Sequence, residues 1–343
     1  MTTKKLGSQT AALANPPSFA GHANVVGKKE GEGPLADSFD YIAPDDTFGE
    51  STWEKSESAM QKQALILALD KAGQPASRLD WLFAGDLLNQ CIGSSYAARG
   101  QGVPFFGLYG ACSTMGEGLA LASMTLDGGF GEWAGVVVSS HFCSAERQYR
   151  TPLEYGSQRT PTAQWTVTGA GAAILAREGP GPYVTHVTVG KVVDKGIKDA
   201  NNMGAAMAPA AYDTISAHLK DTGREPGYYD LIVTGDLGLL GSELLLELLS
   251  RDGIELNNHA DCGALIFDPQ SQDVHCGGSG CGCCASVLTG YLLNGMRAGS
   301  WNNILFCPTG ALHSPTASFQ GESIPGVCHA VAISTSRQPG TQP

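Results

Sequence analysis

The sequence predicts an α/β protein built from two duplicated βαβ-rich halves. Two apolar runs, 79–87 and 229–237, both predict a buried strand that enters a loop at Gly-Asp-Leu. Around both runs the chain repeats one succession of helix, strand, helix-opening turn and strand. A repeat of this length indicates duplication of a whole unit rather than a solenoid. A chance match is the alternative, because short apolar strands that end in Gly-Asp are common.

The elements of the two halves correspond in order. The first half is predicted to contain a helix at 53–71 that stops at Gly73, strands at 79–87 and 104–109, a turn at 110–114, a helix to about Leu126, and strands at 134–138 and 170–176. The second half is predicted to contain a helix at 205–220 that stops at Gly223, a strand at 229–237, a turn at 280–284, a helix to about Arg297, and strands at 303–307 and 329–334. A strand within 180–194 joins the halves.

The domain boundaries follow from this order. We expect a flexible tail at 1–15, a first half at 16–178 with an insertion loop at 142–166, a second half at 179–335, and a flexible tail at 336–343. With 42% hydrophobic and 16% charged residues, the chain has enough apolar material for two cores.

Charge and composition exclude some classes of function. The net charge of −12, from 21 Lys and Arg against 33 Asp and Glu, argues against binding to nucleic acid. We expect no signal peptide and no transmembrane segment, because no apolar stretch is long enough, so any membrane association is predicted to be peripheral. The ten scattered cysteines are typical of a reducing compartment.

Cys112 is the candidate site residue of the first half, because it lies where a predicted strand meets a predicted helix. The partial positive charge of a helix amino terminus favours thiolate, so this position predicts a lowered pKa for the thiol. An exposed thiol at such an elbow is typical of a nucleophile. The alternative is a small cysteine that is buried beneath the turn and inert.

Four longer motifs connect the sequence with a known family. They are GDLLNQC at 85–91, YGACST at 109–114, QRTPTAQWTVTG at 158–169 and GGSGCGC at 277–283. A duplicated α/β unit with a cysteine on its first elbow resembles the thiolase superfamily, which includes the ketoacyl synthases. The motifs resemble more closely the stage V sporulation protein AD family, from Pro16 to about Ile333. The resemblance implies a thiolase-like fold with a layered α-β-α-β-α core.

The resemblance also implies a function. Members of this family are implied to bind dipicolinic acid, the pyridine dicarboxylate of spores, alone or as calcium dipicolinate, and no other cofactor. They are implied to work with other SpoVA membrane proteins in dipicolinate uptake during sporulation and release at germination. We therefore expect a non-catalytic protein that is peripheral on the spore (forespore) inner membrane. Thiolase-like proteins commonly dimerise, so we also expect a homodimer formed through the strand at 104–109.

Residues needed for thiolase-type proton transfer are absent at the expected places. The second-half segment that reads His-Gln-Ala-Asn in ketoacyl synthases is Gly-Asp-Leu-Gly at 235–238, and Ser279 stands where thiolases carry a histidine. Loss of a positioned base removes about 10²–10⁴-fold of rate. We therefore predict no catalytic residue and interpret Cys112 as a vestigial nucleophile. An active acyltransferase that uses Cys112 is the alternative function.

Other residues could replace the missing partners. Cys307 lies loosely near the position of the second thiolase cysteine, and His141, His275 or His313 could act as a base near a strand end. A lone histidine at a loop edge is more often a structural hydrogen-bonding residue.

A flat dianion needs cationic donors, helix N–H groups and an apolar slot. Arg147, Arg150 and Arg159 form the densest arginine supply of the chain, although a solvated loop with surface ion pairs is the alternative. Trp165 predicts either a stacking face or a core residue. The residues predicted to bind the ligand are Cys112, His141, Arg147, Arg159, Thr160, Gln164, Asp236, Ser279 and Gly310.

Two further groups have alternative interpretations. Asp86 and Asp236 either receive calcium or cap the turn that follows each strand, and we favour capping. The cluster of Cys276, Cys281, Cys283 and Cys284 suggests a zinc or iron–sulfur site, but its spacing lacks the paired C-x2-C of zinc knuckles. We therefore predict no metal site in the protein itself.

Overall fold

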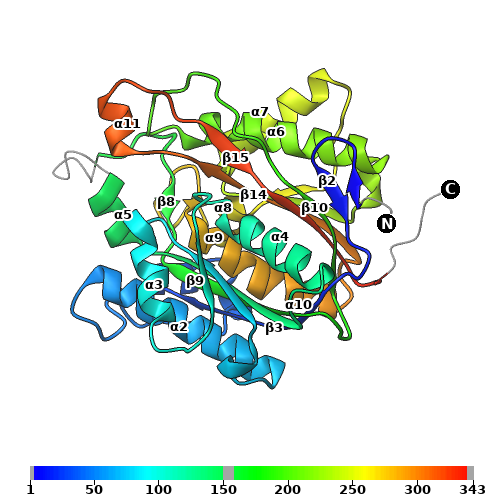
Figure 1. The fold of residues 1–343 in the computed structure, drawn as a ribbon. Coiled ribbons are helices and arrows are strands. Elements are labelled where there is room, and N and C mark those ends of the chain that lie inside the picture. The colour runs from blue at the N-terminus through cyan, green and yellow to red at the C-terminus, as the bar shows by residue number, and fades with distance from the viewer. Residues whose placement is uncertain (1–3, 150–157, 338–343) are drawn as a thin grey trace.

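The computed structural model, which describes residues 4–149 and 158–337, contains two copies of one α/β unit (Figure 1). The first-half strands lie side by side in the order β3 (Ser18–Val26), β9 (Gly169–Ala176), β7 (Trp133–Ser140), β5 (Trp81–Gly85) and β6 (Phe105–Leu108). The second-half strands lie in the order β10 (Tyr183–Thr188), β16 (Ala330–Ser334), β14 (Asn303–Ala311), β11 (Leu231–Gly235) and β12 (His259–Asp261). The two orders correspond strand by strand, as the predicted duplication requires.

Strand directions place the functional ends of both halves together. In the first half β5 runs parallel to β6 and β7, and in the second half β11 runs parallel to β12 and β14. The carboxyl ends of parallel strands meet at one edge of a sheet, where α/β proteins bind ligands. The halves join where Tyr183 of β10 pairs with Ser18 of β3, so the ten strands of the two orders form one continuous sheet.

Helices fill three layers around the two half-sheets (Figure 1). Between the half-sheets lie α4 (Thr114–Asp127) and α9 (Cys281–Val287), which continues through η6 (Leu288–Leu292) into α10 (Leu293–Arg297). The outer layers are α2 (Trp53–Ala72) with α3 (Ile92–Ala98), and α6 (Met203–Thr222) with α7 (Gly238–Arg251). Because α4 packs between two sheets, Met115, Leu119 and Leu126 are fully buried. The layers follow the predicted α-β-α-β-α order.

The two long outer helices end as the sequence predicts. Thr52 accepts a hydrogen bond from the backbone N–H of Lys55 at the start of α2, and Asn202 caps α6 in the same way. Both helices end at a glycine in the left-handed conformation, with φ of 65° at Gly73 and 64° at Gly223.

Shorter elements complete the described chain. They are α1 (Lys28–Gly31), η1 (Ala36–Ser38), β4 (Tyr41–Ile42), η2 (Ala76–Arg78), η3 (Asn89–Cys91), α5 (Phe142–Tyr149), β8 (Trp165–Thr166), η5 (Pro226–Tyr228), α8 (Cys262–Ile266), β13 (Gly278–Ser279), α11 (Pro315–Phe319) and β15 (Gly326–Cys328). Residues 142–166, predicted as an insertion loop, contain α5 and also β8, which pairs with β13. Within the described ranges, no helix is long and apolar enough to cross a bilayer.

The amino-terminal segment differs from its prediction. Residues 4–15, expected to be a flexible tail, form a hairpin of β1 (Lys5–Leu6) and β2 (Thr10–Ala12), and β2 pairs with β10. The Asp221 carboxylate accepts hydrogen bonds from the backbone N–H groups of residues 8, 9 and 10, at 2.8–3.0 Å. Lys4 pairs with Asp127 at 2.7 Å. These partners lie far along the chain, so the local sequence gives no indication of them.

Candidate functional site

The elbow that carries Cys112 is a tight turn between β6 and α4. Ala111 adopts a left-handed conformation with φ of 49°, and its carbonyl accepts hydrogen bonds from the backbone N–H and the hydroxyl of Thr114. The next residue, Ser113, ties the elbow to the second half: its hydroxyl donates to the Pro308 carbonyl at 2.6 Å and accepts from the N–H of His329 at 2.8 Å. The position of Cys112 therefore depends on both halves of the fold.

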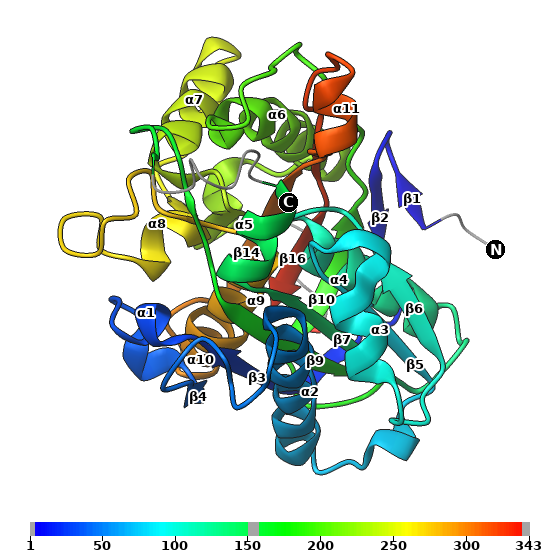
Figure 2. The same cartoon turned by 90° about the vertical axis from the view of Figure 1, so that its left-hand side faces the viewer.

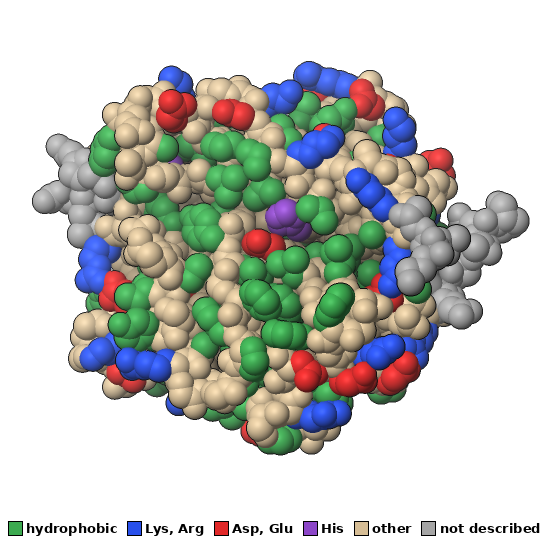
Figure 3. All heavy atoms as spheres, viewed as in Figure 1, with side chains coloured by type: hydrophobic (Ala, Val, Ile, Leu, Met, Phe, Trp, Pro, Cys, Tyr) green, Lys and Arg blue, Asp and Glu red, His purple; other side chains and the backbone are tan. Residues whose placement is uncertain are grey.

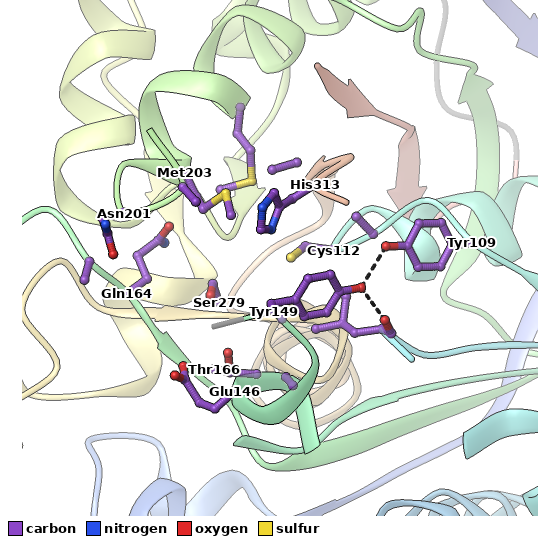
Figure 4. Close-up of a pocket in the computed structure, with 18 residues that line it drawn as sticks. Tyr109, Cys112, Glu146, Tyr149, Gln164, Thr166, Asn201, Met203, Ser279 and His313 are labelled. Atoms are coloured by element: carbon purple, nitrogen blue, oxygen red, sulfur yellow. Dashed lines mark hydrogen bonds between the residues drawn. The ribbon is translucent and has the colours of Figure 1, made fainter. Parts of the chain in front are cut away.

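A cavity of about 220 Å³ opens over this elbow (Figure 4). Both halves contribute to its wall. The lining residues are Leu87, Tyr109, Ala111, Cys112, Ala145, Glu146, Tyr149, Ala163, Gln164, Thr166, Ala200, Asn201, Met203, Met207, Ser279, Gly280, Ala311 and His313. Apolar residues thus alternate with neutral polar groups, and Glu146 is the acidic member of the set. None of these lining residues is Arg or Lys.

Aromatic rings form one side of the cavity (Figure 4). The hydroxyl of Tyr149 donates to the carbonyl of Leu87 and lies 3.0 Å from the hydroxyl of Tyr109. The His313 ring lies 5.6 Å from the Tyr149 ring, measured between centroids. Burial raises the pKa of Tyr109 to about 12 and lowers the pKa of His313, so both are neutral at pH 7. The Nδ1 of His313 is buried and has no hydrogen-bond partner among the described residues.

Polar groups from the paired strands β8 and β13 form another side. Ser279 pairs with Thr166 across the two strands, and both residues line the cavity. The Gln164 side-chain NH₂ donates to the carbonyls of Asp236 at 2.7 Å and Gly278 at 3.0 Å. These bonds fix the amide, and its Oε1 is buried without a partner among the described residues. Such an oxygen can accept a hydrogen bond from a ligand or coordinate a cation.

Cys112 is a thiol rather than a thiolate in this environment. Burial raises its pKa well above the ordinary value, and the negative charge of Asp236 raises it further. The prediction of a lowered pKa is therefore wrong. It rested on the amino terminus of α4, but loss of water and a nearby carboxyl group outweigh the partial charge of the helix end.

Asp236 lies behind Cys112 in an unusual position. It is fully buried and has φ of 108°, and neither carboxylate oxygen makes a well-formed hydrogen bond with a described residue. Its polar neighbours are the thiols of Cys283 and Cys112 and the backbone N–H of Cys284, and burial raises its pKa well above the ordinary value. The local sequence predicted none of these contacts.

The capping predicted for the two aspartates holds for Asp86 and fails for Asp236. Asp86 accepts hydrogen bonds from the backbone N–H of Leu88 at 2.9 Å and of Ser94 at 2.7 Å. The turn after β11 is instead capped by Asp261, which accepts from the N–H groups of residues 237 and 238 at 3.0 and 2.9 Å. Asp261 lies at the end of the neighbouring strand β12, so it takes the position that Asp236 was expected to fill.

The predicted arginines do not line the cavity. Arg147 is not among the lining residues and forms an ion pair with Glu54. Arg159 pairs with Asp273 at 2.6 Å and lies over the ring of Trp165, 4.9 Å from its centroid. Trp165 also stacks on Phe142 and is a packing residue outside the cavity lining. Arg150 lies outside the described residues.

Three other predicted residues lie away from the cavity wall. Thr160 bonds with Thr162, and the buried His141 bonds through Nε2 to the Asp46 carbonyl at 2.7 Å. Gly310 packs beneath the elbow, where a Cβ would lie 2.3 Å from the Gly110 carbonyl oxygen. The structure thus brings Cys112, Gln164 and Ser279 together at the cavity, with Asp236 behind them.

Sequence reasoning missed several cavity residues. Tyr109 opens the YGACST motif that contains Cys112, so the sequence does carry a signal for it. Tyr149 and Glu146 come from α5, where a loop was expected, and Asn201 comes from the segment before α6. No spacing in the sequence links these three to the elbow.

The cysteine cluster is mostly a packing feature. Cys281, Cys283 and Cys284 are fully buried on α9, and burial raises the pKa of each thiol. Cys276 donates to the carbonyl of Pro161 instead. Among the described residues, no group of three or more His, Cys, Asp or Glu side chains is arranged to hold a metal ion.

Comparison with known proteins relates this fold and elbow to two groups. A family model described as stage V sporulation protein AD matches residues 7–334. Stage V sporulation protein AD of Bacillus subtilis (strain 168) is 43% identical over 331 residues, which is 96% of this chain and 98% of that protein. Both findings agree with the resemblance of the four sequence motifs.

Solved structures extend the likeness to the fold. The 3-oxoacyl-[acyl-carrier-protein] synthase III of Aquifex aeolicus VF5 has a TM-score of 0.56 and 13% identity, over 93% of this chain and 99% of that chain. Cerulenin-bound OleA of Xanthomonas campestris has a TM-score of 0.61 and 16% identity, over 93% and 96% of the two chains. At such identities the likeness concerns the fold alone, and it confirms the predicted thiolase-like fold.

Proposed function

The chain belongs to the stage V sporulation protein AD family, and on this premise we propose that it binds dipicolinic acid without reacting with it. One observation carries the proposal: a cavity remains at the Cys112 elbow, while burial and the neighbouring carboxyl group of Asp236 raise the pKa of the thiol. A thiol of raised pKa beside such a group is a poor nucleophile at neutral pH. The elbow then supplies a binding wall.

The form of the ligand follows from the charge of the wall. A bare dianion would meet no Arg or Lys among the described lining residues, of which Glu146 is the acidic member. Calcium dipicolinate is neutral, and calcium accepts further oxygen ligands. Such oxygens lie at the cavity on Glu146, on Asn201 and on Gln164, whose Oε1 has no partner among the described residues. We therefore favour the calcium chelate, with its ring placed against Tyr149 and His313.

The setting of the protein belongs to the same proposal. We infer a peripheral place on the spore inner membrane, contact with other SpoVA membrane proteins, and action in dipicolinate uptake and release at germination. Membership in the family supports these inferences.

A homodimer is also proposed. Strand β6 lies at one edge of the sheet; Phe105 and Phe106 on it are 36% and 49% exposed, and Tyr109, which follows it, is 43% exposed. Figure 3 shows hydrophobic side chains gathered on the face of the molecule that carries α4, where Leu121 and Met124 are exposed. An apolar edge of this kind is suited to pairing with a second copy. A monomeric mass by sedimentation equilibrium at micromolar concentration would contradict the dimer.

Calorimetry tests the binding proposal. Titration with dipicolinate in the presence of calcium should give a stoichiometric signal, stronger than with dipicolinate alone. Cys112→Trp should abolish it by filling the cavity, and Glu146→Gln should weaken it only when calcium is present. The control is Thr160→Ala, because Thr160 is close in sequence to the lining residue Gln164 but does not line the cavity. This variant should bind as the parent does. Absence of heat at millimolar ligand in both forms, or unchanged binding by folded Cys112→Trp, would contradict the proposal.

Acyl transfer through Cys112 is the second candidate, and Asp236 is the observation that favours it. A buried carboxyl with unpaired oxygens beside a thiol could accept the thiol proton during attack on an acyl thioester. Intact-mass spectrometry after incubation with acyl-coenzyme A distinguishes the two functions. An acyl adduct on Cys112 that disappears in Asp236→Asn supports transfer, and no adduct at any chain length counts against it.

A further inference from the structure

Helix α5 separates the cavity from a second concave region. Residues 145, 146 and 149 face the cavity, while Ser144, Arg147 and Gln148 face a groove of about 1040 Å³. The opposite walls of this groove come from residues 50–62, at the start of α2, and from residues 88–99, which include α3. Figure 2 shows α2, α3 and α5 together on the face toward the viewer. We call this region the α5 groove.

The α5 groove is basic on an acidic protein. Four basic residues line it, namely Lys55, Lys62, Arg99 and Arg147, against two acidic ones, Glu50 and Glu54. The whole chain has the opposite balance, with a net charge of −12. Arg147 is paired with Glu54, whereas Lys62 and Arg99 form no ion pair with any residue in the described ranges. The groove therefore offers positive charge that no described residue neutralises by an ion pair.

Apolar surface accompanies this charge. Tyr96 is 53% exposed and Ile92 is 38% exposed, while Leu88 and Ala97 form a buried floor. The Arg99 guanidinium lies 4.6 Å from the centre of the Tyr96 ring. Tyr and Arg side chains are the types that contribute most to protein interfaces. Such a mixture suits a peptide with both acidic and apolar side chains, and the concave shape does not suit a flat surface.

The walls of the groove are fixed to one another. The Gln148 side chain accepts from the backbone N–H of Asn89 at 3.0 Å and donates to the Leu87 carbonyl at 2.9 Å. Beneath α5, the Ser144 hydroxyl donates to the buried Glu57 carboxyl at 2.9 Å. A preformed groove binds a peptide with little cost in ordering its own side chains.

We propose that the α5 groove is a docking site for an acidic, amphipathic segment of a partner protein. Carboxylates of that segment pair with Lys62 and Arg99, and an apolar side chain packs on Ile92 and Tyr96. The partner then contacts the same helix that forms one wall of the cavity. The docking site does not depend on which ligand the cavity holds.

Fluorescence anisotropy with labelled twelve-residue peptides tests this proposal. The acidic probe has alternating pairs of Glu and Leu. A basic peptide, in which Lys replaces Glu, is the comparison. The full-length protein should bind the acidic probe and not the basic one, with affinity that falls as salt rises. The double variant Lys62→Glu with Arg99→Glu should lose at least tenfold in affinity, and Ile92→Glu should also lose affinity because it removes the apolar seat.

A matched control removes the effect of net charge. Lys28→Glu with Lys195→Glu changes the total charge equally but lies outside the groove, and it should bind the acidic probe as the parent does. Equal loss in both double variants, or no binding of the acidic probe, would overturn the proposal. Groove-dependent sedimentation with phosphatidylglycerol vesicles in the absence of peptide binding would assign a lipid surface instead and would also overturn it.

Discussion

The ends of strands β5 and β11 carry the same residues in different chemical environments. Both strands end at a glycine that Asp-Leu follows, and they occupy equivalent places in the two half-sheets. Asp86 is held by backbone N–H groups and by the hydroxyl of Ser94, which donates to it at 2.6 Å. Asp236 has strained backbone geometry and thiol neighbours, and its oxygens lack well-formed hydrogen bonds among the described residues. Duplication has preserved the position of the carboxyl group and not its surroundings.

The difference shows that one carboxyl group stabilises the fold, whereas the other lies at the candidate site. Asp86 belongs to a polar network with Glu57 and Gln61 that stabilises the first half beneath α5. Asp261 caps the turn after β11 in place of Asp236, and Asp236 lies against Cys112. Buried polar groups without partners cost stability, so they persist mainly where a site needs them.

Protonation of the first-half network gives the largest expected effect. Burial, together with the charge of Asp86, raises the pKa of Glu57 to about 8 from its ordinary 4.5. The folded protein then keeps a proton that the unfolded chain releases, so the free energy of unfolding falls as pH rises from about 4.5 to about 8. The fall is roughly 1.4 kcal/mol per pH unit for one proton.

Urea denaturation across this pH range measures the effect, with Glu57→Gln as the comparison. The variant has no titrating group at this position. The difference in the free energy of unfolding between parent and variant should therefore change with pH, and it excludes the contribution of the histidines, which both proteins share. A difference that stays constant from pH 5 to pH 8 would contradict the assignment to Glu57.

Exchange of each aspartate for asparagine compares the two strand ends directly. Asp86→Asn should lower the free energy of unfolding by about 2 kcal/mol, because one oxygen that accepts hydrogen bonds becomes a donor facing other donors. Asp236→Asn should change it by less than about 1 kcal/mol, because Asp236 has no well-formed hydrogen bond among the described residues to lose. Thermal or urea unfolding at pH 7 provides both values. Equal losses would show that the two carboxyls have equivalent surroundings.

Reactivity of Cys112 gives the smallest expected effect. Since its pKa is raised, alkylation by iodoacetamide at pH 7.5 should be at least about tenfold slower than for the same cysteine in the unfolded chain. Asp236→Asn should speed the reaction severalfold, because the acidic neighbour is removed. Peptide mass spectrometry measures Cys112 separately from the other partly exposed cysteines, which are Cys91, Cys143 and Cys276. Fast alkylation of the parent protein would instead indicate a thiolate.

The sequence predicted those parts of the fold that depend on local patterns. The apolar strands with a Gly-Asp end and the glycine stops of α2 and α6 were identified, because turn chemistry and periodicity lie within a few residues. The hairpin of residues 4–15 was not, since its main acceptor, Asp221, is more than two hundred residues away. Helix α7 was also not among the expected elements, although it is rich in leucine.

The site was predicted in part for the same reason. Cys112, Gln164 and Ser279 came from motifs and do line one cavity. Arg159 was placed in the site by charge alone, but it pairs with Asp273, which is 114 residues away, and it does not line the cavity. The predicted shift in the pKa of Cys112 had the wrong direction. A helix end can be recognised in the sequence, whereas burial and the position of Asp236 depend on the tertiary structure.

The amino-terminal hairpin has a consequence for the order of folding. Its partners belong to both halves, since Lys4 reaches Asp127 in the first and the backbone at residues 8–10 reaches Asp221 in the second. The hydroxyls of Thr10 and Thr188 meet at 3.0 Å across 178 residues of chain. Contacts of such separation form only after the intervening chain is compact. The hairpin is thus expected to form late in folding. Protection of its amides from hydrogen exchange would then report that the two halves have docked.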